Sequence, residues 1–154
     1  MRTLNRFAPL KEMLRSTAAA LLSLVASTAT ADQLTIVLTN IEKAEGSLMV
    51  QVGPQASFEA GEGEQPAPMP MQIVLPAQIG EVQFTTDALP GGTYAVQAFH
   101  DVNGNGDMDS NFVGMPKEPW GFSNNARGNF GPPKFADTKF ELSGSAELQI
   151  ELKR

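Results

Sequence analysis

The chain of 154 residues contains no cysteine and only one histidine, His100. Without cysteine it cannot form disulfides, zinc–cysteine sites, iron–sulfur clusters or a thiol nucleophile. A metal motif that needs two histidines is excluded as well, although a Ser-His-Asp site stays possible. Basic residues are also scarce, because 11 Lys or Arg stand against 17 Asp or Glu and the net charge is −6. This balance argues against nucleic acid as a partner.

A long hydrophobic run is missing too, but residues 1–31 have the pattern of a secretory signal. Four basic residues accompany a short apolar stretch at 18–26, and Ala29-Thr30-Ala31 offers small residues at the cleavage positions. The apolar stretch is shorter than the roughly 20 residues that span a bilayer. We therefore predict a signal peptide over 1–31, export to the periplasm or the medium, and no integral membrane segment after its removal.

The remaining 123 residues, 32–154, are predicted to form one domain. The signal segment holds four of the 11 basic residues and one of the 17 acidic residues, so the net charge of the remainder is −9. Such a protein should be repelled by nucleic acid and by anionic lipid surfaces, and it should attract cations. Without disulfides, an exported fold of this size depends on its apolar core, alone or with a bound ion.

Short stretches of alternating apolar and polar residues recur after residue 32, and this pattern is typical of strands with one buried face. We expect seven strands, at 33–41, 47–52, 71–75, 81–85, 93–100, 138–142 and 146–152. The polar link at 42–46 between the first two predicts a hairpin. Together these elements predict an all-β fold, an antiparallel seven-stranded β-sandwich with a long ordered loop.

Two segments interrupt the strand pattern. Residues 53–70 are acidic and rich in Gly and Pro, which predicts a loop with little packing and a helical turn near Phe58. Residues 101–135 form a long loop, and such loops in compact domains are either functional or disordered. Five of the ten aromatic residues after residue 31 lie in it, so we expect it to be ordered.

The run from Asp101 to Asp109 has an oxygen-bearing side chain at every second position and glycine at 104 and 106. Ca²⁺ takes six to eight oxygen ligands, and a curling loop can direct alternate side chains at one ion. The predicted ligands are Asp101, Asn103, Asn105, Asp107 and Asp109. A plain turn is the alternative interpretation, because Asn and Asp favour turns without any ion.

The spacing of this run matches only the first half of an EF-hand loop. Position 12 is Phe112, where a bidentate Glu belongs, and a strand precedes Asp101 where an EF-hand has a helix. We therefore expect a related loop, completed by Asp107, Asp109 or Asn111. Extracellular modules of this sort bind Ca²⁺ with dissociation constants of about 10⁻⁴–10⁻³ M.

Aromatic, amide and guanidinium side chains gather at 120–127. Trp120, Phe122, Asn125 and Arg127 could line a groove for a glycan or a peptide, such as a partner in the cell envelope. The same side chains could instead fix the loop, with Arg127 paired to an acid of the 101–109 run. A glycan- or peptide-binding accessory module is therefore the alternative function.

His100 shares a strand face with Tyr94, Val96 and Ala98, which favours a buried histidine that hydrogen-bonds the adjacent loop. A hydrolase that uses His100 is the third alternative, but no serine near it lies in a nucleophile elbow. Met69 and Met71 have the chemistry of thioether copper ligands, and plain packing is the simpler interpretation.

The chain also resembles a family of exported bacterial proteins, the domain-of-unknown-function family numbered twenty-one forty-one. The resemblance rests on FHDVNGNGDMD at 99–109, GMPKEPWGFSNN at 114–125 and FGPPKF at 130–135. It implies a sandwich similar to transthyretin-like or immunoglobulin-like domains, in several of which loops of this kind bind calcium. It implies no catalytic residue, because the family's activity is uncharacterised. We therefore predict a non-enzymatic exported module with a Ca²⁺-binding loop and an unknown partner.

Overall fold

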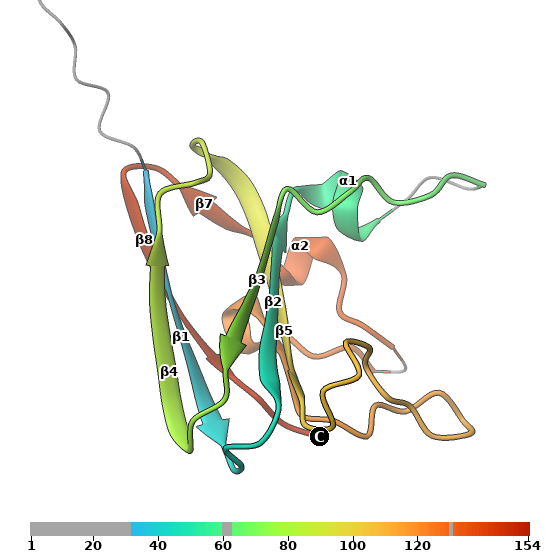
Figure 1. Ribbon diagram of the computed structural model, residues 1–154. Coiled ribbons are helices and arrows are strands. Elements are labelled where there is room, and N and C mark those ends of the chain that lie inside the picture. Colours follow the sequence, from blue (N-terminus) through green and yellow to red (C-terminus); the bar gives the residue numbers. More distant parts are fainter. Residues whose placement is uncertain (1–31, 60–62, 130) are drawn as a thin grey trace, which may run out of the picture.

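Two β-sheets lie face to face in the computed structural model, which describes residues 32–59, 63–129 and 131–154 (Figure 1). The predicted signal peptide at 1–31 lies outside the described residues. Within the described part, no helix is long and apolar enough to cross a membrane.

The smaller sheet has three strands and the larger has five. The order in the smaller sheet is β4 (Gly80–Thr86), β1 (Gln33–Ile41) and β8 (Ser145–Glu151). The order in the larger sheet is β3 (Met71–Pro76), β2 (Ser47–Gly53), β5 (Gly92–Asp101) and β6 (Trp120–Phe122). Strand β7 (Phe140–Leu142) pairs with the start of β5, on the edge whose other half pairs with β6. Strand β5 is thus the central element from which the long loop leaves.

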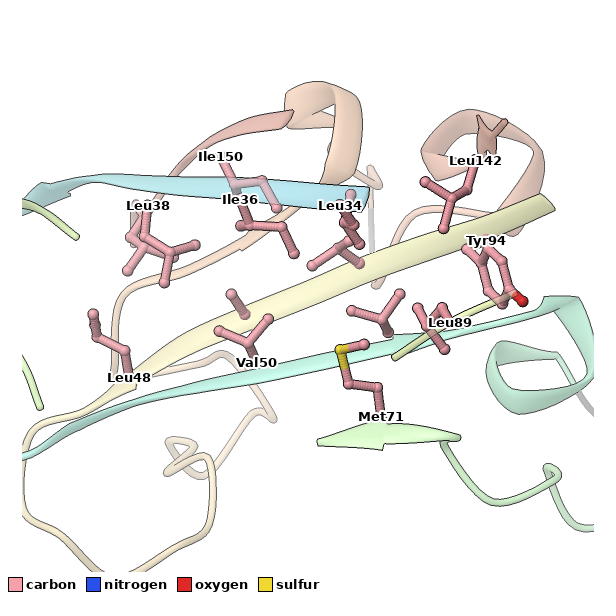
Figure 2. Packing of buried hydrophobic residues seen from close by; sticks show 14 of the residues in the cluster. Leu34, Ile36, Leu38, Leu48, Val50, Met71, Leu89, Tyr94, Leu142 and Ile150 are labelled. Atoms are coloured by element: carbon pink, nitrogen blue, oxygen red, sulfur yellow. The ribbon is translucent and has the colours of Figure 1, made fainter. Parts of the chain in front are cut away.

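The apolar residues of each strand alternate as the sequence predicts, and they meet between the sheets. Leu34, Ile36 and Leu38 of β1 are fully buried, and Figure 2 shows them with Leu48 and Val50 of β2 in the same core. Burial of apolar surface of this kind is the main stabilising contribution in a domain that has no disulfide. The prediction of an all-β sandwich is confirmed.

Three details of the predicted topology are wrong. The described residues form eight strands where seven were expected, and the additional strand is β6 inside the long loop. Strands β1 and β2 do not form a hairpin, since β1 pairs with β4 and β8 while β2 pairs with β3 and β5. The sandwich is also not wholly antiparallel, because β1 and β8 run parallel. Alternation shows that a strand has one buried face, but it does not show which strand lies beside it.

The link between β1 and β2 crosses from one sheet to the other and packs against the end of β5. Gly46 has φ +77°, and a Cβ there would overlap the main-chain oxygen of Asp101 and lie 2.8 Å from the Cα of Val102. His100 hydrogen-bonds through Nε2 to the main-chain oxygen of Glu45 at 2.7 Å. The link therefore supports the point at which the long loop begins.

The long loop is ordered over most of its described length. It contains β6 and a 3₁₀ turn, η1 (Ser123–Asn125), and ends at the short helix α2 (Phe135–Thr138). Helix α1 (Gln55–Phe58) lies where a helical turn was predicted, and the rings of Phe58 and Phe135 are 6.0 Å apart.

Candidate functional site

Asp101 ends β5 and organises the loop that follows it. The N–H groups of Gly104 and Asn105 donate to its Oδ1 at 2.8 and 3.1 Å, and the N–H of Gly106 donates to its Oδ2 at 2.8 Å. Gly104 and Gly106 have φ of +72° and +83°, a region that L residues with side chains adopt at a cost. One carboxylate and two glycines thus curl the backbone around the side chain of Asp101.

The remaining predicted ligands lie on the exposed side of this curl. Asn103 and Asn105 each accept an N–H two residues further along, from Asn105 at 3.1 Å and from Asp107 at 2.9 Å. Their amide groups donate to Asp109, from Asn103 to Oδ2 at 2.6 Å and from Asn105 to Oδ1 at 3.3 Å. Four of the five candidates therefore converge in one network, while Asp107 enters it through its main-chain N–H.

Glu118 joins the network from the other end of the loop, and sequence reasoning missed it. Its Oε1 accepts the N–H of Val102 at 2.8 Å, and its Oε2 accepts the N–H of Asp109 at 3.2 Å. It therefore ties the start of the 101–109 loop to its end. No motif spacing marks Glu118, and the only sequence signal is an acidic residue beside Pro119 and Trp120 in a segment with few charges.

Asp101 and Glu118 are almost completely buried, at 2% and 5% exposure. Buried carboxylates are costly unless paired or hydrogen-bonded. In the described part of the chain the one ion pair joins Lys153 to Glu151, so neither carboxylate has a basic partner there. Main-chain N–H groups are the hydrogen-bond donors to both carboxylates.

The oxygen atoms of this network fit a hard cation in part. A carboxylate has about four acceptor positions; Asp101 uses three and Glu118 uses two in the hydrogen bonds above. The amide oxygens of Asn103 and Asn105 each use one of two. Among the described residues no three Asp, Glu, His or Cys side chains come close enough to hold a metal ion by themselves. Any cation would therefore need amide, main-chain or water oxygens as well, as Ca²⁺ commonly takes.

Asn111 is not brought to the loop. Its Oδ1 accepts the N–H groups of Val113 and Met115, both at 3.0 Å. Phe112, at the position of the EF-hand glutamate, is fully exposed. The loop is therefore not an EF-hand, in agreement with the sequence.

The residues of the second candidate site are used for packing against β8. Arg127 stacks over Trp120, with 4.3 Å between its Cζ and the ring centroid, and donates to the main-chain oxygens of Trp120 and Glu151 at 3.1 and 3.2 Å. Asn125 accepts the N–H of Glu151 at 2.8 Å, and Phe122 is buried beside Trp120, with 5.7 Å between the ring centroids. Arg127 thus bonds to main chain where an acid of the 101–109 run was considered. Glycan or peptide binding here stays a prediction.

His100 is 1% exposed, and its ring bonds the main chain of Glu45, as expected for a buried histidine that bonds the adjacent loop. A hydrolase that uses His100 would need this ring exposed to a substrate, and the ring is buried. Met71 is part of the apolar core, which explains it by packing.

An open cavity of about 580 Å³ lies between α1 and α2, lined by Gln55, Glu59, Thr93, Lys134 and Lys139 among others. The carboxylate of Glu59 accepts the N–H of Phe135 at 2.8 Å and the amide of Gln55 at 2.8 Å. These bonds, the first of them most strongly, hold the pKa of Glu59 below its ordinary value of 4.5, and nearby Lys134 adds to the effect. The cavity contains no residue of either predicted site.

Residues 36–151 match the model of the family described as "Uncharacterized protein conserved in bacteria (DUF2141)". The match spans both sheets and both candidate sites, and it confirms the resemblance seen in the sequence. No curated protein and no solved structure matches the chain.

Proposed function

We propose, from the premise that the chain belongs to the DUF2141 family of uncharacterised bacterial proteins, that it is an exported, non-enzymatic β-sandwich module whose loop at 101–109 binds Ca²⁺. Export rests on the signal pattern of residues 1–31. No reaction is proposed, because the activity of the family is uncharacterised.

One observation supports the calcium proposal above all others. The buried carboxylates of Asp101 and Glu118 bond the backbone of the same loop from its two ends, without a basic partner among the described residues. Two negative charges in one partly dehydrated network repel each other. A divalent cation held by oxygen ligands would turn this repulsion into attraction.

The residues proposed to hold the ion are Asp101, Asn103, Asn105, Asp109 and Glu118. Asp107 stays a predicted ligand from the sequence, with its side chain or its main-chain oxygen. The ion would close the loop against the end of β5 and would do no chemistry. Its role would correspond to that of a disulfide in other exported domains. This chain has no cysteine and cannot form a disulfide.

The first test is thermal unfolding of the protein without residues 1–31, in EGTA and then in about 1 mM Ca²⁺. With a dissociation constant of about 10⁻⁴ M, linkage adds roughly 1.4 kcal/mol of stability. For a domain of this size the melting temperature should rise by about 5 °C. Mg²⁺ at the same concentration should have a smaller effect, because it demands octahedral geometry and keeps its waters.

Matched variants locate the site. Glu118→Gln removes the charge and keeps one of the two oxygens, so one of the two main-chain N–H bonds is lost and the Ca²⁺ response should fall by about half or more. Unfolding of this variant in EGTA gives the cost of the lost hydrogen bond separately. Asp101→Asn should behave in the same direction, and Glu147→Gln, on the exposed face of β8, should respond as the unaltered protein does. Calorimetric titration gives a readout that does not depend on stability. No heat of binding and no shift of the melting temperature in Ca²⁺ would remove the proposal.

A further inference from the structure

The segment that follows the 101–109 loop is a small hairpin, here called the finger, residues 109–117. The N–H of Lys117 donates to the main-chain oxygen of Asp109 at 2.8 Å, and the N–H of Asn111 donates to that of Met115 at 2.9 Å. Ser110 and Pro116 form a bridge between its two sides. In Figure 1 the chain after β5, drawn in gold and orange, extends away from the two sheets.

The tip of the finger, residues 111–115, exposes large apolar side chains. Phe112 is 100% exposed, Val113 64% and Met115 62%. Four of the six exposed large hydrophobic residues in the described chain lie between 108 and 115. Scattered single hydrophobic residues on a surface need no explanation, whereas a cluster on a protruding segment is typical of a contact surface.

The finger tip also has two properties that suit contact with an apolar surface. No charged residue occurs from Ser110 to Pro116. Four of the five main-chain N–H groups from 111 to 115 already donate within the finger, two of them to the side chain of Asn111. Backbone groups that enter a lipid phase must be bonded internally, because each unbonded group costs several kcal/mol there.

The base of the finger has the opposite character and borders the proposed calcium loop. Glu118 bonds the N–H of Asp109, the residue at which the loop ends and the finger begins. The carboxylates of Asp101, Asp107 and Asp109 would repel lipid phosphates unless a cation lies between them. A bound Ca²⁺ offsets these charges and can share its remaining ligand positions with phosphate oxygens.

We infer that the finger docks on a phospholipid surface, with Phe112, Val113 and Met115 placed among the acyl chains and the calcium loop at the level of the phosphates. This inference rests on the proposed function for its calcium dependence. Without a bound ion, the attraction to lipid would come from the apolar tip. We favour a lipid surface over a partner protein because a bilayer has an apolar layer beneath a layer of phosphates. The apolar tip of the finger would lie in the first, and its charged base in the second.

The test is co-sedimentation of the protein without residues 1–31 with vesicles of phosphatidylcholine and phosphatidylglycerol, in Ca²⁺ and in EGTA. Binding is expected in Ca²⁺ and should weaken at least about tenfold in Phe112→Ser, since burial of one such side chain is worth about that factor. Val74→Ser is the matched control, because Val74 is 60% exposed but lies on β3. Its binding should equal that of the unaltered protein.

The outcomes separate the two proposals. Calorimetric Ca²⁺ binding without vesicle binding would overturn the lipid inference and leave the calcium site standing. Equal vesicle binding of Phe112→Ser and the unaltered protein would overturn it as well. Vesicle binding that is equal in EGTA but lost in Phe112→Ser would support the apolar tip and overturn the calcium dependence of docking, while the calcium site itself is decided by the calorimetric titration.

Discussion

Two polar segments of the long loop, 101–109 and 120–127, are candidate sites in the sequence, the first as the leading prediction and the second as the alternative, and the structure uses them differently. In 101–109 the side chains are mainly acceptors, and they bond the N–H groups of their own loop. In 120–127 the side chains of Asn125 and Arg127 bond the main chain of β8, another strand of the sandwich. The first segment organises itself, while the second joins two parts of the fold.

This difference indicates what each segment can still bind. Oxygen atoms that accept one hydrogen bond retain a second lone pair for a cation. The guanidinium group of Arg127 stacks on Trp120 and donates to two main-chain oxygens, so it already makes contacts within the protein that a ligand would have to replace. The comparison therefore favours an ion at 101–109 and a structural role at 120–127, and variants can separate the two.

The largest effect is expected at the support of the first segment. In Gly46→Ala the new Cβ would overlap the main-chain oxygen of Asp101, in a backbone conformation with φ +77°. We expect a loss of roughly 3 kcal/mol in the free energy of unfolding, measured in urea, and a weaker Ca²⁺ response. Gly80→Ala is the control, because φ is +98° there but no atom lies within 4 Å, so only about 1 kcal/mol should be lost. Equal losses in both variants would mean that the link does not support the loop.

A smaller effect is expected in the second segment. Arg127→Met keeps the aliphatic contact with Trp120 but removes the donors to Trp120 and Glu151. The free energy of unfolding should fall by about 1 kcal/mol, by the same amount in EGTA and in Ca²⁺. A loss that appears only in one of the two conditions would break the separation between the segments.

The smallest effect is expected from Glu59, which bonds α2 and belongs to neither segment. Because its pKa is lowered by the N–H of Phe135, the folded state favours the ionised form. The contribution is present above the ordinary pKa of 4.5 and is lost as the pH falls through the lowered folded value. Melting temperatures of the unaltered protein and Glu59→Gln should therefore differ slightly at neutral pH and converge in acid. A difference in melting temperature that persists unchanged in acid would mean that the effect does not depend on the charge of Glu59.

The sequence predicts seven of the eight described strands from stretches in which apolar and polar residues alternate. The sixth, predicted at 138–142, begins only at Phe140, because Thr138 is the end of α2. Strand β6 escapes because Trp120-Gly121-Phe122 is too short to alternate. Gly121 there lies against β8, where a Cβ would stand 2.7 Å from Ile150 and 2.8 Å from the oxygen of Glu151. The calcium candidates Asp101 to Asp109 were found from spacing, whereas Glu118 reaches them only through the fold. Contacts between distant segments leave no periodic signal in the chain.

The parallel pairing of β1 with β8 has a consequence for how the protein is made. Gln33 lies beside Ser145, and the N–H of Gly144 donates to Asp32, 112 residues earlier. Strand β1 therefore leaves the ribosome well before its second neighbour, because Gln33 pairs with Ser145. Contacts so distant in sequence form slowly. Until β8 has been made, the smaller sheet lacks one of its three strands, and a delay in completing this sheet would suit the proposed export, which needs an unfolded chain.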